Sequence, residues 1–506
     1  MGEGGIVDLL VVGGGINGAG IARDAAGRGL NVVLCEQGDL ADHTSSSSSK
    51  LIHGGLRYLE YYEFRLVREA LIEREVLLKA APHIIWPLRF ILPHSPDQRP
   101  AWMIRLGLFL YDHLGGREKL PGSASINLKT DPAALPLKPE IARAFSYADC
   151  WVDDARLVVL NAMDAAERGA EILTRTRCTE ARRKDGIWQA TLASSRGTPM
   201  RTIRARALVN AAGPWVSAFI KNRLRQDSDS SVRLVKGSHI VVNKLFDHDS
   251  PYILQNPDGR IVFVIPYERD YSLIGTTDQE YKGDPADIEI DRDEIDYLLS
   301  SVNRYFKEPV EADQIVWSYA GARPLYDDAK GNASAVTRDY VFDLDADQGE
   351  APLLSIFGGK LTTYRKLAEH ALEKLQPAMG FEGEPWTAAS PLPGGDIPNA
   401  DAEAYLKIIL ERWNWLPEAL ARRYVRAYGT RIDRLMGKAS GLDDLGQHFG
   451  DDLYEAEVVY LMSAEWALTD EDILWRRSKL GLHVTDETKA RLRAWLGRNS
   501  EIEASA

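Results

Sequence analysis

A glycine-rich segment near the start of the sequence has the composition of a nucleotide-binding turn. Gly13-Gly14-Gly15-Ile16-Asn17-Gly18 follows an apolar run at 9–12 and precedes a helix-forming run at 19–28. In this pattern one glycine makes the turn, one lets the backbone approach a pyrophosphate, and one lets the helix pack on the strand. The helix N-terminus then faces the phosphates. We therefore predict that Gly13, Gly15, Asn17 and Gly18 bind a dinucleotide, the alternative being an ordinary glycine-rich turn.

An acidic residue supports this interpretation. Glu36 follows the next apolar run, at 31–34, and stands about 20 residues after the glycines, as in dinucleotide-binding βαβ units. A carboxylate there accepts hydrogen bonds from a ribose diol and disfavours a 2′-phosphate, so NADP is not expected.

A second strand, glycine turn and helix occurs late in the chain. The run Leu353 to Phe357 is followed by Gly358-Gly359 and a helical pattern from Leu361. An enzyme that uses free nicotinamide cofactor has no need of this second turn, whereas a chain that returns to the same nucleotide fold places Gly358 and Gly359 against a flavin. The pattern therefore favours FAD, although a simple tight connection is the alternative. Ala212 and Gly213 end another buried strand and are assigned to the same site.

These motifs require an α/β fold. We expect a discontinuous Rossmann-like FAD-binding domain from 1–232 and 346–380, with part of 60–150 contributing to the substrate side. Alternating β-branched runs at 233–345 predict an inserted antiparallel β-sheet domain that binds substrate. A linker at 381–398 leads to a helical C-terminal domain, 399–506, in which we expect no strand.

Composition excludes several classes of function. The net charge of −13 disfavours nucleic acid. Cys35, Cys150 and Cys178 are too scattered for disulfides or a CxxC metal site, and no His/Cys/Asp cluster has metal-ligand spacing, so no metal is expected. The segment before the first strand, expected from Asp8, is too short for a signal peptide, and no apolar run approaches the roughly 20 residues that span a bilayer. A cytoplasmic protein is therefore expected.

Several longer motifs carry a family resemblance. They include Thr44-Ser45-Ser46-Ser47-Ser48-Ser49-Lys50-Leu51-Ile52-His53-Gly54-Gly55-Leu56-Arg57-Tyr58-Leu59-Glu60 and the segments 111–115, 149–157, 236–239, 274–278, 321–324 and 357–365. Through them the chain resembles the respiratory, FAD-dependent sn-glycerol-3-phosphate dehydrogenase family, within the D-amino-acid-oxidase-like flavoproteins. The resemblance implies oxidation of sn-glycerol 3-phosphate to dihydroxyacetone phosphate by hydride transfer to flavin N5, with electrons passed to membrane quinone. It also implies a homodimer attached peripherally to the cytoplasmic face of the inner membrane.

A phosphate dianion needs cations in its pocket. The candidates are Arg57, Arg323, Arg338 and Lys360, which lie in glycine-flanked or family-matching motifs, although each by itself could be a surface or salt-bridging residue. Tyr58 is expected to donate to the phosphate, with core packing as its alternative. Thr276 is expected to contact the substrate hydroxyls or to cap its strand.

Oxidation of a secondary alcohol needs a base near the hydroxyl. His239, in Lys-Gly-Ser-His, is the predicted base, and His53 is the competitor, assigned here to a flavin contact. Arg323 and Lys360 are also candidates for stabilising the reduced flavin. The remaining FAD contacts are predicted from two motif segments: Thr44, Ser45, Ser46, Ser49, Lys50, Leu51, His53, Gly54 and Gly55 in the first, and Gly358, Gly359, Lys360, Leu361 and Thr362 in the second. The alternative for the serine run is a flexible linker.

Two other functions are possible for this pattern: a soluble glycerol-3-phosphate oxidase that reduces oxygen, and a non-catalytic or tRNA-modifying FAD-binding protein.

An apolar stripe in the sequence is a candidate site of membrane attachment. The segment 100–111 places Trp102, Met103, Leu106, Phe109 and Leu110 at mostly helical spacing, as in an interfacial helix. The competing expectation is that this stripe packs on the FAD domain.

Overall fold

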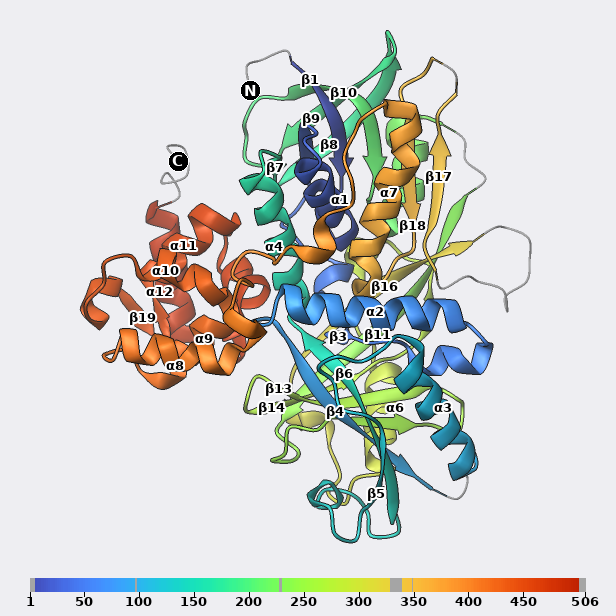
Figure 1. Cartoon of the computed structure of the whole chain (residues 1–506). Coiled ribbons are helices and arrows are strands. Elements are labelled where there is room, and N and C mark those ends of the chain that lie inside the picture. The colour runs from blue at the N-terminus through green and yellow to red at the C-terminus, as the bar shows by residue number, and fades with distance from the viewer. Residues whose placement is uncertain (1–4, 96–97, 227–229, 328–338, 348, 500–506) are drawn as a thin grey trace.

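The computed structural model describes residues 5–95, 98–226, 230–327, 339–347 and 349–499. The chain forms a nucleotide-binding domain, a cap domain built on a second large sheet, and a helical C-terminal domain that lies against the junction of the other two (Figure 1). The predicted fold class, an α/β Rossmann-like domain with an inserted, mainly antiparallel sheet domain and a C-terminal helical domain, is confirmed.

The nucleotide-binding domain is built on a sheet in which eight strands are described. Its main order is β17-β18-β10-β1-β2-β7, and a β8–β9 hairpin extends from β10. Strand β1 lies between β2 and β10 and is parallel to both. The connections to these two neighbours therefore lie on opposite sides of β1, which leaves a crevice at the carboxyl ends of the strands. The strands are β1 (Ile6–Val12), β2 (Val32–Cys35), β7 (Glu171–Leu173), β8 (Thr176–Lys184), β9 (Ile187–Ser194), β10 (Arg201–Asn210), β17 (Val341–Asp345) and β18 (Leu353–Phe357).

Helix α1 packs between α4 and α7 on this sheet. Its apolar side chains, with those of the strands, form a continuous buried core, as expected for parallel strands covered by helices. The helices are α1 (Ile16–Gly27), α4 (Asp154–Glu167), α5 (Val216–Phe219) and α7 (Tyr364–Met379).

The cap sheet combines two separate parts of the chain. Among the described residues its ten strands include the order β15-β11-β14-β13-β12-β4-β6-β3, with β16 paired to β11 and β5 paired to β6. The strands are β3 (Leu51–Ile52), β4 (Ile85–His94), β5 (Ala124–Asn127), β6 (Arg143–Val152), β11 (Ser231–Asn243), β12 (Tyr252–Gln255), β13 (Ile261–Tyr267), β14 (Tyr271–Gly275), β15 (Gln279–Tyr281) and β16 (Ile315–Asp327). The helices α2 (Phe64–Ala80), α3 (Ala101–Leu114) and α6 (Arg292–Asn303) accompany it.

Domain boundaries differ from the sequence expectation at two points. Strand β17, expected in the substrate domain, pairs antiparallel with β18 in the nucleotide-binding sheet, because the chain returns to that domain before the buried strand begins. The cap also includes β3, which precedes the 60–150 segment.

The C-terminal domain has its own apolar core, formed by α8 (Ala402–Arg412), α9 (Glu418–Tyr428), α10 (Ile432–Met436), α11 (Glu455–Glu465) and α12 (Asp486–Asn499). Against expectation, it also holds a small ribbon of β19 (His448–Gly450) and β20 (Leu453–Tyr454). The ribbon forms because Gly450 and Asp451 adopt positive φ and reverse the chain between two short segments.

Buried ion pairs dock the C-terminal domain on the nucleotide-binding domain. Both terminal nitrogens of Arg477 lie 2.7 Å from the Asp39 carboxylate, which is itself buried. Arg156 of α4 pairs with Glu465 of α11. A buried charge needs a partner, so these pairs fix the two domains in one relative position.

Candidate functional site

Two adjoining cavities follow the carboxyl ends of β1, β10 and β18. The smaller, about 470 Å³, contacts Gly13, Glu36 and Ala212, and the larger, about 950 Å³, lies between the nucleotide-binding domain and the cap. Both are lined by Ile16, Thr44, Ser45, Pro324, Gly358 and Gly359, so the two cavities lie side by side.

The glycine turn has the geometry that the sequence predicts for a pyrophosphate cradle. Gly13 has a φ of +116°, and a Cβ there would lie 2.4 Å from the Ala211 carbonyl oxygen. A Cβ on Gly18 would lie 1.9 Å from the Gly13 carbonyl oxygen, so only glycine lets helix α1 approach the strand this closely. Gly15 precedes α1 with no side-chain cap, and Asn17 Oδ1 is buried with no hydrogen-bond partner among the described residues. Gly13, Gly15 and Asn17 line the smaller cavity, so the residues present fit a dinucleotide there.

Glu36 also lines the smaller cavity, but its carboxylate has a second role. Its oxygens accept hydrogen bonds from the backbone N–H groups of Gly14, at 2.6 Å, and Gly38, at 2.8 Å. Burial raises the pKa of this carboxyl above its ordinary value. Glu36 therefore holds the glycine turn in shape at the place where a ribose is expected.

The serine segment is a folded loop rather than a flexible linker. Asp154, at the start of α4, accepts a hydrogen bond from Ser48 Oγ at 2.7 Å and forms a buried ion pair with Lys50 at 2.8 Å. Lys50 was predicted to contact the cofactor, but its ammonium binds Asp154 and the Ser46 carbonyl oxygen, and the residue lines neither cavity.

Of the other expected cofactor contacts, Gly18, Ser46 and Gly54 line neither cavity. Leu51, His53, Gly55, Leu361 and Thr362 line the larger one, Ala212 and Gly213 line the smaller, and Thr44 and Ser45 line both.

The predicted substrate-binding residues gather in the larger cavity. Arg57, Tyr58, Thr276, Arg323 and Lys360 all line it. Lys360 Nζ lies 4.0 Å from the centre of the Tyr58 ring. Arg323 donates a hydrogen bond of 3.0 Å to Thr276 Oγ1, so two residues predicted separately act as a pair. Arg338, the fourth predicted cation, lies outside the described residues.

The guanidinium of Arg323 lies beside Gly237 of β11, diagonally across from the register partner of Arg323, Val235. A Cβ on Gly237 would lie 2.5 Å from Arg323 Nη2 and 2.7 Å from Thr276 Oγ1. The glycine in Lys-Gly-Ser-His therefore keeps space for a guanidinium on the adjacent strand, β16.

His239 is buried and lines the same cavity. Its Nε2 lies 2.9 Å from Ser49 Oγ, whereas Nδ1 is buried and has no hydrogen-bond partner in the part of the chain that the structure describes. Burial lowers the pKa of the imidazole well below its ordinary value, and Arg323 and Lys50 lower it further. The sequence led us to expect a base that titrates near neutrality. Burial instead favours the neutral ring, which keeps a lone pair for a proton but holds that proton less strongly than an exposed imidazole would.

The competing histidine lines the cavity as well. The backbone N–H of His53 donates to Thr362 Oγ1 at 3.1 Å, which joins the first motif segment to the turn after β18. Burial lowers the pKa of His53 too, against the opposing influence of Asp149.

Sequence reasoning missed two supporting residues. Asp154 anchors the serine loop, and Tyr319 stacks on His239 with ring centres 4.8 Å apart and planes 15° apart. Asp154 stands in a segment that carried the family resemblance, so its position at a helix start was a usable signal. Tyr319 had none, because its contact depends on the pairing of β11 with β16.

No described helix is long and apolar enough to cross a membrane. No group of three or more His, Cys, Asp or Glu side chains within the described ranges has the arrangement of a metal site.

Known proteins share this architecture. The FAD dependent oxidoreductase family matches residues 8–365, and the C-terminal domain of alpha-glycerophosphate oxidase matches residues 386–496. The chain is 59% identical to a glycerol-3-phosphate dehydrogenase of Pseudomonas aeruginosa, over 97% of this chain and 95% of that protein. It is 57% identical to a D-erythritol 1-phosphate dehydrogenase of Brucella abortus, over 96% and 97%. The crystal structure of a glycerol-3-phosphate dehydrogenase from Bacillus halodurans, complexed with FAD, superimposes with a TM-score of 0.80 and 27% identity, covering 98% of this chain and 91% of that one.

Proposed function

The chain belongs to the FAD-dependent glycerol-3-phosphate dehydrogenase family, and we propose on this basis that it oxidises sn-glycerol 3-phosphate to dihydroxyacetone phosphate. The observation that carries the proposal is the meeting, in one cavity beside the nucleotide cradle, of Arg57, Arg323 and Lys360 with the buried His239. The cations suit a phosphate dianion, and a neutral imidazole suits the removal of a hydroxyl proton.

In the proposed reaction, Arg57 and Lys360 bind the substrate phosphate, and Arg323 with Thr276 orients the hydroxyl groups. The proton of the secondary hydroxyl passes to His239 Nε2, with Ser49 Oγ, already 2.9 Å away, as the bridging group. FAD, when bound, supplies the acceptor for the hydride that leaves the same carbon. The Gly13 to Gly18 turn would hold its pyrophosphate, and the serine loop and the Gly358-Gly359 turn would hold its flavin end.

A second substrate is favoured by one observation, the 57% identity to a D-erythritol 1-phosphate dehydrogenase. Erythritol 1-phosphate, like glycerol 3-phosphate, has a phosphate monoester next to a secondary hydroxyl, so the same cations and base suit both. The four-carbon compound only needs a longer pocket. Comparing kcat/KM for the two compounds decides which one the enzyme prefers.

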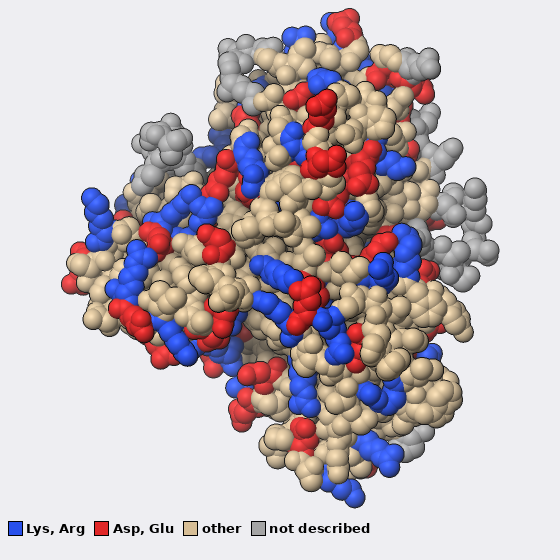
Figure 2. Space-filling model, in the orientation of Figure 1, with Lys and Arg blue, Asp and Glu red and all other residues tan. Residues whose placement is uncertain are grey.

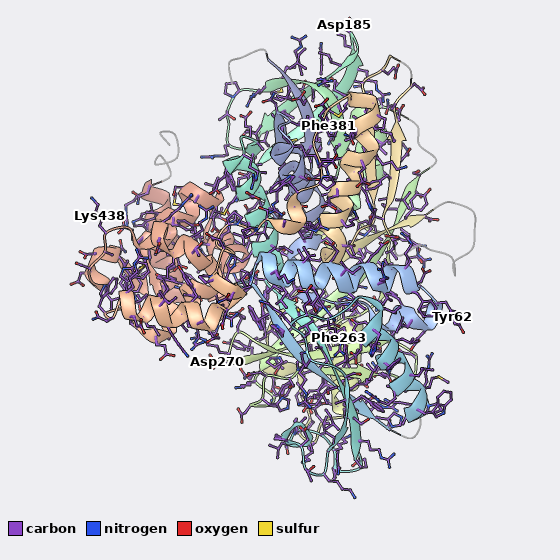
Figure 3. The ribbon with its side chains drawn as sticks, in the orientation of Figure 1. Tyr62, Asp185, Phe263, Asp270, Phe381 and Lys438 are labelled. Carbon is purple, nitrogen blue, oxygen red and sulfur yellow. The ribbon has the colours of Figure 1, made fainter. Side chains whose placement is uncertain are left out.

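We also propose that electrons pass to membrane quinone and that α3 makes the membrane contact. Trp102, Leu106 and Phe109 are 66%, 51% and 52% exposed, whereas the opposite face of α3 packs on the cap through Leu108 and Tyr111. This arrangement does not agree with packing of the stripe on the FAD domain. Tyr62, 80% exposed, lies on the same side of the molecule (Figure 3). Few charged side chains cover this region, while acidic and basic groups are interspersed over the rest of the visible face (Figure 2).

The larger cavity gives this surface a connection to the site. Its lining includes Met103, Ile104 and Leu110 of α3, together with Arg57 and Lys360 near the cradle. An apolar quinone entering from the bilayer beside α3 would thus reach the flavin end without crossing bulk water. The homodimer and the cytoplasmic face of the inner membrane remain part of this proposal.

The experiment that tests the function is a steady-state assay of the purified, detergent-solubilised enzyme. Glycerol 3-phosphate, erythritol 1-phosphate and glycerol are compared as substrates, each with a soluble quinone analogue and with oxygen as acceptor. The proposal predicts turnover with glycerol 3-phosphate and quinone, and little with glycerol. Faster turnover with oxygen would identify an oxidase, and the absence of turnover with either phosphate would contradict the proposal.

A further inference from the structure

A row of aromatic rings connects the C-terminal domain to His239. Trp475 stacks on Trp317, with ring centres 4.4 Å apart and planes 29° apart. Trp317 lies 5.0 Å from Tyr319, which in turn stacks on His239 at 4.8 Å. The row crosses from one domain, through the cap, to the histidine assigned to proton transfer.

Strand pairing explains the inner part of the row. In the antiparallel pair of β11 and β16, His239 lies opposite Tyr319 and Val241 lies opposite Trp317. Residues two apart on a strand share one face, so Trp317 and Tyr319 point to the same side as His239. Directly opposed side chains pack in contact, and this gives the stack of His239 on Tyr319.

Tyr319 holds both members of the Ser49–His239 pair. Its ring lies against the imidazole, and its hydroxyl donates a 2.8 Å hydrogen bond to the carbonyl oxygen of Ser48. Ser49, the next residue, contacts His239 Nε2. A displacement of Tyr319 would therefore change the position of the imidazole and of its hydrogen-bond partner together.

The C-terminal domain fixes the outer end of the row. Trp475 belongs to the short helical segment Asp472–Arg477, which the nucleotide-binding domain holds through the Arg477–Asp39 pair and an Arg175–Asp472 contact of 2.6 Å. On the other side Gly481 leaves room for the indole, since a Cβ there would lie 2.3 Å from Trp475 Cε2.

The same domain also holds the cap nearby. The Tyr271 hydroxyl donates to the Leu482 carbonyl oxygen at 2.8 Å, close to the hairpin that carries Asp270 at the edge facing the C-terminal domain (Figure 3). The segment that carries Trp475 is thus bound to the nucleotide-binding domain, and the segment that carries Leu482 is bound to the cap.

We propose that Trp475 is a positioning residue, through which the C-terminal domain holds Tyr319 and His239 in register for proton transfer. The proposal rests on the proposed role of His239. It gives the C-terminal domain, which contributes no residue to the lining of either cavity among the described residues, a part in the reaction.

The first test is Trp475→Leu in the FAD-loaded enzyme. Anaerobic flavin reduction by glycerol 3-phosphate should slow by about three- to tenfold, the range that one aromatic contact is worth, with FAD content and KM within about twofold of wild type. Trp475→Phe should restore most of the rate. Trp495→Leu is the matched control, because Trp495 is buried in the same domain against Phe449 and is outside the row. It should lower the unfolding temperature and leave the reduction rate unchanged.

The second test asks whether the effect passes through His239. Trp475→Leu is combined with His239→Gln, and a double-mutant cycle is completed. We expect Trp475→Leu to have no further effect on the rate once His239 is replaced. An equal loss in both backgrounds would overturn the proposal, and so would a wild-type rate in Trp475→Leu. If Trp475→Leu does not retain FAD, Gly481→Ala displaces the indole from the other side and must give the same loss. A wild-type rate in His239→Gln would instead contradict the proposed base.

Discussion

Ser49 Oγ lies 2.9 Å from Nε2 of His239, although the two residues are 190 positions apart in the chain. The serine comes from the loop beside the nucleotide cradle and the histidine from a central strand of the cap. The pair therefore forms only when the two domains are assembled, and it places the proposed base in the cavity that holds the candidate phosphate ligands.

His239→Gln should lower the rate of flavin reduction by about 10²-fold or more, because the hydroxyl proton loses its acceptor. His448→Gln, at an exposed site in the C-terminal domain, should not change the rate. His53→Gln separates the two candidates. If His53→Gln gives the larger loss and His239→Gln leaves the rate intact, the base is His53.

The pH dependence follows from the lowered pKa of His239. The base works only when neutral, and burial keeps it neutral below the ordinary histidine value of ~6.5. The wild-type reduction rate should accordingly stay constant as pH falls through that value, and should decline only in more acidic solution. Stopped-flow reduction across this range tests the point, and a rate that halves near the ordinary value would contradict it.

Arg57→Ala should raise the KM for glycerol 3-phosphate about ten- to a hundredfold, since one charge-assisted contact is worth about 1.5–3 kcal/mol. Glycerol, which has no phosphate, should be no worse a substrate than for wild type. Arg65→Ala is the control, because Arg65 is exposed and pairs with Glu69 and Asp339. An unchanged KM in Arg57→Ala would remove Arg57 from the pocket.

Glu268, in the hairpin between β13 and β14, makes stability depend on pH. Burial and then Asp153 raise its pKa to about 7. Between pH ~4.3, the ordinary pKa of a glutamate in the unfolded chain, and the raised pKa of about 7, the folded state keeps a proton that the unfolded state releases. The free energy of unfolding therefore falls as pH rises through this range. Glu268→Gln should raise the unfolding temperature at pH 8 and change it little at pH 4.5, whereas exposed Glu308→Gln should have no effect at either. Equal stability of Glu268→Gln and wild type at pH 8 would contradict this.

The double variant Trp102→Glu, Phe109→Glu should stay folded, keep FAD and reduce a soluble dye normally, because both side chains are exposed and line neither cavity. It should leave the membrane fraction and lose activity with membrane quinone. Ile408→Glu with Val459→Glu removes two exposed apolar side chains from the C-terminal domain as a control. If that pair detaches the enzyme and the α3 pair does not, the membrane contact lies on the C-terminal domain.

The nucleotide-binding fold could be read from the sequence because its signals are local. Gly13 to Gly18, Glu36 and Gly358-Gly359 each follow a buried strand within a few residues. The cavity residues Arg57, Arg323 and Lys360 came from motif resemblance. What the sequence did not reveal depends on pairing between distant segments. Lys50, for instance, was assigned to the cofactor but meets Asp154, 104 residues away.

The C-terminal domain illustrates the same limit. Its helical pattern predicted helices, but nothing near Trp475 in the sequence indicates that it stacks on Trp317. Likewise, the pairing of Arg477 with Asp39 depends on how two separately folded cores meet. Such contacts are set by the tertiary assembly and leave no periodic or compositional pattern.

The most direct test of the central claim is an anaerobic titration of the purified FAD-loaded enzyme with sn-glycerol 3-phosphate, followed by the flavin absorbance. We expect stoichiometric bleaching by sn-glycerol 3-phosphate, none by glycerol, and recovery of the oxidised spectrum on adding a soluble quinone analogue. A flavin that stays oxidised at saturating sn-glycerol 3-phosphate, but is bleached by erythritol 1-phosphate or by neither compound, would contradict it.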